Sequence, residues 1–484
     1  MTSPVAGTPL SLRFAIWLVA IGIGVAASFI DRFVSTPSIA LRLQAACGVL
    51  CLILVVAGFS RNLRQVNWKT IFWGIVLQVG LALLILKVQW TWGDTTYSVY
   101  EFFRRLGSAI QQFLDFTTAG TRFVFGVLAD RETMGKVFGP HNSVILAFGV
   151  LPTIIFASCF FSLLYYLRVL QFFVTVFATS MMYVMRTSGA ETLSAVANVF
   201  LGQTEAPLIV KPYISKMTKS ELLALMVGGM ATISGGIMAV YIQMGADPVG
   251  ILVTSVMAAP CGMYLSKLLW PETEKPVTLG KAEAPVEVPF SNAIDAISAG
   301  ASDGMKLMIN VMAMLVAFLA LLAMVNYLLD FTYVSIFSEA TRADWLARYG
   351  IVKFDLTYIF SKLFAPLAFL IGVTGDDISR VADLLGIKLV GNEFLAYAKL
   401  TGEYHYQTGS SPMSHRSFIL ATFALTGFAN FSSVGIQIGG IGALAEDRRS
   451  DLAKLGMKAL FLGFIATLIN AAIAGMLMSD KLQN

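Results

Sequence analysis

Long apolar runs constrain this chain most, because a bilayer core about 30 Å thick needs roughly 20 helical residues to cross it. Each run is a continuous apolar block, without the period-two alternation of a membrane β-barrel strand. The sequence therefore predicts an all-α polytopic membrane protein with about nine transmembrane helices. The nine runs are 14–30, 43–59, 70–88, 143–166, 221–244, 248–265, 307–329, 417–443 and 456–478.

Composition agrees with a chain that faces lipid rather than water. Hydrophobic residues make up 57% of the chain and charged residues 13%, whereas a soluble domain carries about a quarter charged residues. The formal charge of +5 comes from basic residues scattered among loops. Because they form no patch, we do not expect nucleic-acid binding.

Loop charges predict the orientation in the membrane. Basic residues gather in the loops 61–69, 211–219 and 448–458, and acidic residues in the loops 244–249 and 330–345. Basic loops stay in the cytoplasm. We therefore expect a cytoplasmic N-terminus, an external C-terminus and insertion in the cytoplasmic (inner) membrane.

Two regions, 171–213 and 354–400, are too polar for ordinary spans and too apolar for loops. Each holds a glutamate close to an amide side chain: Gln203 precedes Glu205, and an asparagine precedes Glu393. Backbone that enters and leaves a membrane on the same side is tolerated where protein or a water-filled cavity satisfies it. Both regions are therefore predicted to be re-entrant hairpins.

A span rich in glycine and small polar residues follows each hairpin. The first contains "VGGMATISGGIMAVY" (227–241) and the second "TGFANFSSVGIQIGG" (426–440). Such a composition at mid-membrane depth is typical of broken helices. Because the loop charges give the two units opposite orientations, the sequence predicts an inverted repeat, the plan of many secondary transporters.

Residues 97–120 mix aromatic and charged side chains at helical spacing, which predicts a helix in the membrane interface. The whole chain is thus expected to have six parts. They are an extra N-terminal transmembrane helix and loop (1–42), scaffold helices (43–92), an interfacial helix with its connector (93–140), the first repeat with a broken helix at 220–244 (141–270), a cytoplasmic linker (271–305) and the second repeat with a broken helix at 416–443 (306–484).

The two glutamates favour transport over other functions. A carboxylate inside a membrane is costly, so Glu205 and Glu393 are expected on a substrate or ion pathway. Asn198 and carbonyls freed at a hairpin tip offer the neutral oxygens that suit a monovalent cation. A membrane hydrolase would need a catalytic constellation that the spans lack, so we expect no enzyme. A channel is the closer alternative, because pore linings also break helices.

Four segments together resemble the concentrative nucleoside transporter family: "FGVLPTIIF" (148–156), "NVFLGQTEAPLIVKPY" (198–213), "LVGNEFLAY" (389–397) and "GFANFSSVGIQIGG" (427–440). The resemblance covers the chain from about residue 43. It implies an elevator-type symporter, a homotrimer embedded in membrane lipid, that imports nucleosides of the uridine, cytidine and adenosine class. It implies no cofactor beyond the coupling ion, with sodium favoured over a proton because of the complete "GQTEAP" run.

The resemblance also assigns roles to individual residues. It implies three groups: Gln203, Thr204, Glu205 and Ile237 at the nucleobase; Glu393, Phe428, Asn430 and Ser433 at the ribose; and Asn198, Thr232 and the carbonyls of Leu201 and Ile233 at sodium.

Overall fold

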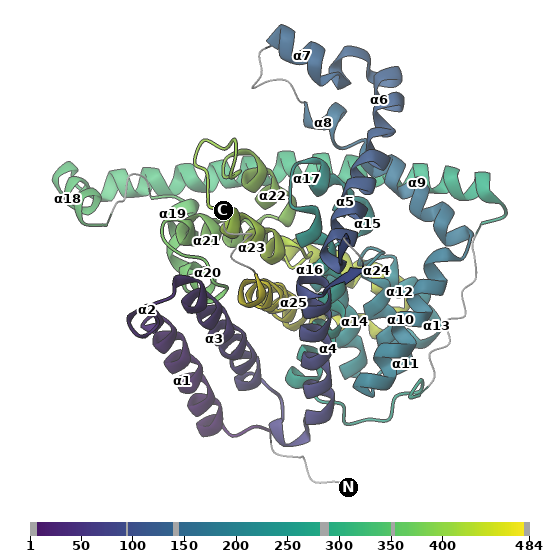
Figure 1. The fold of residues 1–484 in the computed structure, drawn as a ribbon, viewed down its shortest axis with the longest axis horizontal. Coiled ribbons are helices and arrows are strands. Elements are labelled where there is room, and N and C mark those ends of the chain that lie inside the picture. Colours follow the sequence, from purple (N-terminus) through teal and green to yellow (C-terminus); the bar gives the residue numbers. More distant parts are fainter. Residues whose placement is uncertain (1–6, 93–94, 139–144, 281–289, 350–353, 479–484) are drawn as a thin grey trace.

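The computed structural model describes residues 7–92, 95–138, 145–280, 290–349 and 354–478, and these residues are almost entirely helical (Figure 1). Within them, eight helical segments are long and apolar enough to cross a membrane. This agrees with the predicted polytopic all-α fold. The segments are α1 (Leu10–Ala27), α3 (Pro37–Gly58), α4 (Trp68–Lys87), α8 with α9 (Leu146–Gly149, Thr153–Tyr166), α14 with α15 (Lys219–Ala231, Gly235–Gln243), α16 (Pro248–Leu269), α17 (Ala293–Ile336) and α25 (Arg449–Leu477) with the short helix before it.

The ninth predicted run, 417–443, consists of two shorter helices, α23 (His415–Leu425) and α24 (Phe431–Leu444). A further apolar helix, α10 (Val169–Met185), lies inside the first region predicted to be a hairpin. The turn of that region therefore belongs to the residues after α10.

Hairpin 1 is the segment 189–214. It contains α11 (Gly189–Ala197), a turn, and the short helices α12 (Ala206–Ile209) and α13 (Lys211–Ile214). Ser188 and Glu191 form a reciprocal capping box at the start of α11, which satisfies backbone N–H groups that would otherwise be orphaned. Pro207 stands in the first turn of α12, where a residue without an N–H starts a new helix rather than extending the old one.

Hairpin 2 is the segment 377–402, with α21 (Asp377–Val390) and α22 (Glu393–Gly402) joined by a tight turn. The side chain of Asn392 caps α22 by accepting from the Leu395 N–H at 2.9 Å. Two short helices, α19 (Leu356–Leu363) and α20 (Ala365–Leu370), lead into this hairpin.

Two interruptions separate the halves of the broken helices. Break 1 is residues 232–234, between α14 and α15, and break 2 is residues 426–430, between α23 and α24. A threonine ends the first half in both: the Thr232 hydroxyl donates to the Gly228 carbonyl at 2.9 Å, and the Thr426 hydroxyl donates to the Thr422 carbonyl at 2.7 Å. The two repeats are therefore built from matching parts.

The two breaks touch each other. The Phe428 N–H donates to the Thr232 carbonyl at 3.1 Å. Gly427 has φ +155°, and a Cβ on it would lie 3.0 Å from the Met230 carbonyl oxygen. Only glycine adopts this backbone without strain, so Gly427 permits the close crossing at the centre of the molecule.

The remaining elements lie around this centre. A two-stranded antiparallel hairpin of β1 (Gln89–Trp92) and β2 (Thr95–Ser98), which the sequence did not predict, precedes α5 (Val99–Asp115). α6 (Thr117–Phe125) and α7 (Arg131–Phe138) project from the body at the top of Figure 1. α5 and α6 cover the region predicted to be interfacial. α2 (Ile30–Phe33) and α18 (Glu339–Tyr349) are peripheral.

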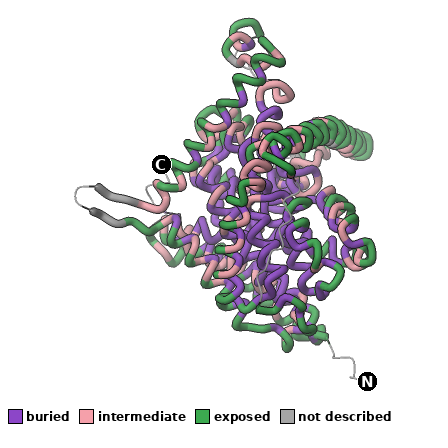
Figure 2. The backbone as a smooth tube through the Cα atoms, turned by 90° about the vertical axis from the view of Figure 1, so that its right-hand side faces the viewer, coloured by how far each residue is buried: buried purple, intermediate pink, exposed green. Residues whose placement is uncertain are grey.

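Figure 2 shows buried residues concentrated in the middle of the molecule, whereas most residues of α17 are exposed or half-buried. The apolar windows of α14 with α15, α16 and α25 are 94%, 89% and 83% buried, but that of α17 is 12% buried. α17 has 44 residues and begins at Ala293, inside the region predicted to be a linker. It packs mainly on α9 and leaves a long apolar surface uncovered.

Candidate substrate site

The polar side chains predicted to bind substrate gather where the two hairpins and the two breaks meet. Glu393 is the first residue of α22, and its side chain is buried, with 6% of its surface exposed. Its two carboxylate oxygens accept from different helices. Asn430 Nδ2 donates to Oε2 at 2.9 Å, and the Tyr241 hydroxyl donates to Oε1 at 3.0 Å. Hairpin 2 is thereby joined to both broken helices.

The orientation of Asn430 follows from its position as the N-cap of α24. Its Oδ1 accepts from the Ser433 N–H at 2.9 Å and from the Ser432 hydroxyl at 2.7 Å. Because the oxygen caps the helix, the amide NH₂ is the end left to face Glu393.

The phenol of Tyr241 is also fixed by its surroundings. Its ring stacks on that of Tyr397 with centroids 4.2 Å apart, and the Tyr397 hydroxyl donates to the Thr422 carbonyl at 2.9 Å. An ionised carboxylate has about four acceptor positions. Two positions on Glu393 are occupied, and about two remain for a ligand such as a vicinal diol.

A second polar chain lies beside the first. Gln203 Nε2, in hairpin 1, donates to the Ser433 hydroxyl at 3.2 Å, and Gln203 Oε1 accepts from Gln437 Nε2 at 3.2 Å. Gln437 Nε2 also donates to the Met226 carbonyl at 3.0 Å. A Cβ on Gly229 would lie 2.5 Å from Gln437 Nε2, so this glycine makes room for the amide pair.

Thr204 and Glu205 are exposed at the tip of hairpin 1. Glu205 Oε2 accepts from the Gly202 N–H at 3.1 Å and so closes the turn. The Thr204 methyl would lie 3.2 Å from a Cβ on Gly440 of α24. These two side chains therefore border the polar cluster rather than join it.

Ile237 is buried on α15, and its N–H donates to the Ser234 hydroxyl at 3.4 Å. Phe428 is half-buried in break 2, next to the crossing point. Both predicted contact residues thus lie on or beside a break.

The residues predicted to bind sodium lie at the end of α11 and in break 1. Asn198 is fully buried, and its Nδ2 donates to the Ser194 carbonyl at 2.9 Å. Its Oδ1 is buried without a hydrogen-bond partner among the described residues. Asn198 Nδ2 would lie 3.1 Å from a Cβ on Gly228, whose carbonyl accepts from Thr232.

An orphaned buried acceptor calls for an unseen partner such as an ion or a water. A neutral amide oxygen beside the freed carbonyls of a helix break suits a monovalent cation. In the described ranges, no group of three or more His, Cys, Asp or Glu side chains could hold a metal ion. The residues present fit sodium on this chemistry.

Sequence reasoning missed two residues that complete the cluster, Gln437 and Tyr241. Both stand one helical turn from a residue that it found: Gln437 is four residues after Ser433, and Tyr241 is four residues after Ile237. Positions four apart share a helix face. This spacing could have predicted that Gln437 and Tyr241 face the same cluster as Ser433 and Ile237.

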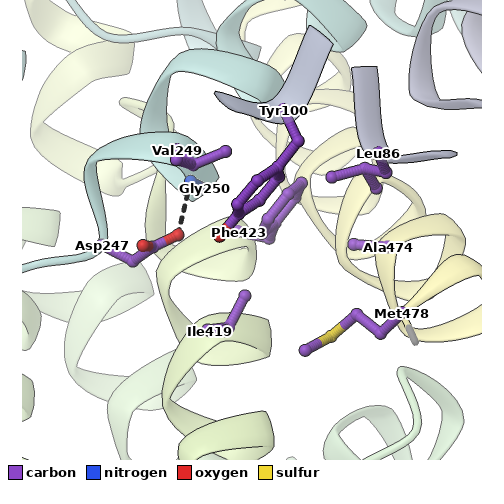
Figure 3. Close-up of a pocket in the computed structure, with 9 residues that line it drawn as sticks. All are labelled: Leu86, Tyr100, Asp247, Val249, Gly250, Ile419, Phe423, Ala474 and Met478. Atoms are coloured by element: carbon purple, nitrogen blue, oxygen red, sulfur yellow. Dashed lines mark hydrogen bonds between the residues drawn. The ribbon is translucent and has the colours of Figure 1, made fainter. Parts of the chain in front are cut away.

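A small cavity of about 20 Å³ lies near the start of α16 (Figure 3), and its lining includes none of the polar cluster residues. Its volume corresponds to about one water molecule. Asp247 points toward it and accepts from the Gly250 N–H at 2.6 Å. Burial raises the pKa of Asp247 to about 6. The lining residues are Leu86, Tyr100, Asp247, Val249, Gly250, Ile419, Phe423, Ala474 and Met478.

Paired hairpins and broken helices around a buried polar cluster define a secondary membrane transporter. Family profiles identify which one: residues 47–128 match "Na+ dependent nucleoside transporter N-terminus", residues 147–248 match "Nucleoside recognition" (Gate), and residues 250–475 match "Na+ dependent nucleoside transporter C-terminus". The chain belongs to the Na+ dependent nucleoside transporter family. This is a transporter family and not an enzyme family, as the sequence analysis expected.

Relatives and solved structures agree. The chain is 38% identical over 449 residues to sodium/nucleoside cotransporter 1 of Rattus norvegicus, covering 90% of this chain and 64% of that protein. It thus spans less than two thirds of the length of this mammalian relative. An uncharacterized transporter of Haemophilus influenzae is 38% identical over 438 residues, with 90% of this chain and 97% of the relative covered.

Two solved structures of the transporter CNTnw have the same fold. The inward-facing substrate-bound state matches with a TM-score of 0.79 and 35% identity, covering 90% of this chain and 99% of that one. An outward-facing state of a substituted CNTnw matches with a TM-score of 0.79 and 34% identity, covering 90% and 98%.

Proposed function

We propose that this protein is a sodium-coupled symporter that imports nucleosides across the cytoplasmic (inner) membrane by an elevator-type alternating-access mechanism. Its N-terminus lies in the cytoplasm and its C-terminus outside, because the loops 61–69, 211–219 and 448–458 carry the basic residues.

The main observation behind this proposal is that a carboxylate group and an amide group meet at one place. Glu393, which Asn430 holds in position, offers a carboxylate with free acceptor positions. Gln203, linked to Ser433, offers an amide that both donates and accepts. A ribose presents two vicinal hydroxyl donors, and a nucleobase edge presents donors and acceptors together. The cluster therefore matches the two ends of a nucleoside.

Substrate binding exchanges internal hydrogen bonds for ligand bonds. A base edge at Gln203 replaces the bond from Gln437, whose amide keeps its second acceptor, the Met226 carbonyl. Because each broken internal bond is replaced by a ligand bond, the net cost of this exchange stays small.

Sodium acts on the same turn as the base-binding amide. Asn198 is five residues before Gln203, and the carbonyl of Leu201 lies between them. A cation held by Asn198, Thr232 and the carbonyls of Leu201 and Ile233 would fix this turn against break 1. Coupling follows, because an ordered turn lowers the entropic cost of placing Gln203 and Glu205 at the base.

Two further observations support the transport cycle and the assembly. CNTnw has been solved in inward-facing, outward-facing and intermediate states, as alternating access requires of that protein.

α17 carries large exposed apolar side chains, among them Val316 and Tyr327. Lipid or a second copy of the chain would cover such a surface, in keeping with a homotrimer in the membrane.

The test is uptake of radiolabelled uridine and adenosine into proteoliposomes under imposed sodium or proton gradients, compared side by side. An inward sodium gradient should drive accumulation, and a proton gradient at equal sodium on both sides should not. If uptake instead follows the proton gradient and ignores sodium, the coupling ion is a proton. If neither gradient drives the uptake of either nucleoside, the proposed function is wrong.

A further inference from the structure

One fully buried lysine lies close to the substrate cluster and has no role in the function proposed above. Lys388 is on α21, three residues before Gly391 at the tip of hairpin 2, and 0% of its surface is exposed. Its Nζ donates to the Ala424 carbonyl at 2.8 Å and to the Thr467 hydroxyl at 2.9 Å. In the described part of the chain, no carboxylate forms a direct ion pair with it, and the carboxylate that acts on it electrostatically at longer range is Glu393.

The partners of Lys388 are those expected of a bound cation. Ala424 belongs to the last turn of α23, which ends at Leu425 because the backbone leaves the helix in break 2. The last carbonyls of a helix lack intrahelical donors, and that end carries partial negative charge. The Lys388 ammonium therefore neutralises the partial negative charge at the C-terminus of α23, in the interior of the protein.

The first repeat has its candidate sodium site at the corresponding place. Asn198 is four residues before Gly202 in hairpin 1, and it lies beside the last turns of α14, where break 1 cuts the helix. Thr232 and Thr426 end the two half-helices with the same hydroxyl bond. One repeat thus has an orphaned neutral oxygen at this position, and the other has an ammonium.

We propose that Lys388 is a tethered cation that does in the second repeat what the coupling sodium does in the first. It holds hairpin 2 against break 2 at every sodium concentration, so the ribose half of the site is always formed. The base half, on hairpin 1, forms only when sodium binds. Lys388 is in this sense a positioning residue, and this inference rests on the proposed function.

Hydrogen exchange of the purified protein in sodium chloride and in choline chloride tests the asymmetry without any substitution. Sodium should slow exchange of the amides in 196–205 and 231–235 about tenfold or more, and should leave those in 387–396 and 424–430 unchanged. Equal protection of both sets by sodium would overturn the proposal. Protection of neither set would refute the sodium site, and with it the claim that Lys388 replaces a sodium ion.

The variants are Lys388→Met, which removes the charge, and Lys388→Arg, which keeps it. In Lys388→Met the amides of 387–396 and 424–430 should exchange faster in both salts, and uridine affinity at saturating sodium should fall about tenfold. The sodium concentration for half-maximal binding should stay within twofold. Lys388→Arg should retain most of the affinity.

Lys399→Met is the matched control. Lys399 is on the same hairpin and pairs with Asp383 at 2.7 Å, so its loss removes a lysine but no bond to a break. Uridine affinity in Lys399→Met should stay within about twofold of the native value. If Lys388→Met and Lys399→Met behave alike, or if Lys388→Met shifts the sodium midpoint as much as Asn198→Ala does, the proposal is wrong.

A second inference comes from an independent feature, a cavity of about 560 Å³ between the ends of α3, α16 and α25. The Arg61 guanidinium stacks on the Trp270 ring at 4.3 Å from its centroid, and the Lys458 ammonium lies 5.6 Å from the same centroid. Large exposed apolar side chains, Phe59 and Met457, form the wall of the cavity. Among the described residues, neither cation has a carboxylate partner.

The geometry points to an anionic phospholipid as the occupant of this cavity. Two cations without acidic partners attract a phosphodiester, and basic pockets between spanning helices are typical headgroup sites. Phe59, Phe461 and Met457 line the same cavity and form an apolar wall against which acyl chains would pack. Inorganic phosphate has no apolar part that would pack against that wall.

Thermal unfolding and native mass spectrometry with phosphatidylglycerol, phosphatidylcholine or inorganic phosphate test this site. Phosphatidylglycerol alone should stabilise the protein and remain bound. The double substitution Arg61→Gln with Lys458→Gln should reduce its retention severalfold. The control pair Arg64→Gln with Lys454→Gln, exposed in the same two regions, should not. Equal retention by both pairs, or equal stabilisation by inorganic phosphate, would overturn the assignment.

Discussion

Replacement of Glu393 by glutamine should remove the preference for ribose hydroxyls while leaving the protein folded. In the native protein, Asn430 and Tyr241 occupy one acceptor position on each carboxylate oxygen, at 2.9 and 3.0 Å. Two vicinal hydroxyls of a riboside fill the remaining positions. A ligand without them leaves a buried charge partly unsatisfied, at a cost of about 1–3 kcal/mol.

That cost corresponds to roughly tenfold weaker competition by 2′,3′-dideoxyuridine, because about 1.4 kcal/mol is one decade in affinity. In Glu393→Gln, one of the two carboxylate oxygens becomes an NH2 donor, and the remaining oxygen keeps one internal donor, because Asn430 and Tyr241 face different oxygens. The variant therefore has about one free acceptor position and no buried charge at this place. We expect its affinity for uridine to fall about tenfold and its dideoxy penalty to shrink below about threefold.

The assay is competition of uridine and 2′,3′-dideoxyuridine against labelled uridine uptake in proteoliposomes. Glu205→Gln is the matched control: it also neutralises a glutamate of a hairpin, but among the described residues its carboxylate accepts a hydrogen bond from the Gly202 N–H alone. Glu205→Gln should weaken all ribosides and keep the dideoxy penalty. An unchanged penalty in Glu393→Gln, beside a lost penalty in Glu205→Gln, would show that the sugar and base assignments are reversed.

Three further predictions concern packing, pH and topology. Gly427→Ala places a Cβ 3.0 Å from the Met230 carbonyl oxygen at a backbone φ of +155°. The substitution should therefore lower the free energy of unfolding by about 1–3 kcal/mol and lower the unfolding temperature. An unchanged unfolding temperature would contradict the tight crossing of the two breaks. Burial raises the pKa of Asp247 to about 6. Between about pH 4 and 6 the folded state therefore binds more protons than the unfolded state, and the stability of the fold falls as pH rises through that window. Asp247→Asn should therefore raise stability at pH 7.5 and not at pH 4, and an equal effect at both would refute the shift. Single cysteines at Lys216 and Glu339, in a background without native cysteines, should react with an impermeant reagent from inside and outside respectively; reaction at 216 from outside would exclude the inverted topology.

The spans and the inverted plan could be predicted because the bilayer imposes length and apolarity locally, residue by residue. The boundaries of hairpin 1 could not, because the apolar helix α10, with 17 residues, directly precedes hairpin 1, and the sequence analysis took the two together as one hairpin. The strand pair before α5 was missed for a related reason, since four-residue strands carry too short a pattern to recognise.

The site was predictable where the chain itself is polar and not where the fold supplies the partner. Asn430 and Glu393 stand out as polar residues in apolar surroundings, and the structure joins them. In the sequence, Tyr241 does not stand out from its apolar neighbours. Its hydroxyl reaches Glu393 because α15 packs against α22 in the folded protein. Lys388 follows the same rule, because its partners Ala424 and Thr467 lie 36 and 79 residues further along the chain.

The most direct test of the account is equilibrium binding of uridine to the purified protein as sodium replaces choline at constant ionic strength. If Asn198 and break 1 hold a sodium that orders Gln203, uridine affinity should rise with sodium to a plateau. In Asn198→Ala, the same plateau should be approached only at a sodium concentration at least tenfold higher. Uridine binding with the same affinity in choline as in sodium would contradict the coupling of the two sites.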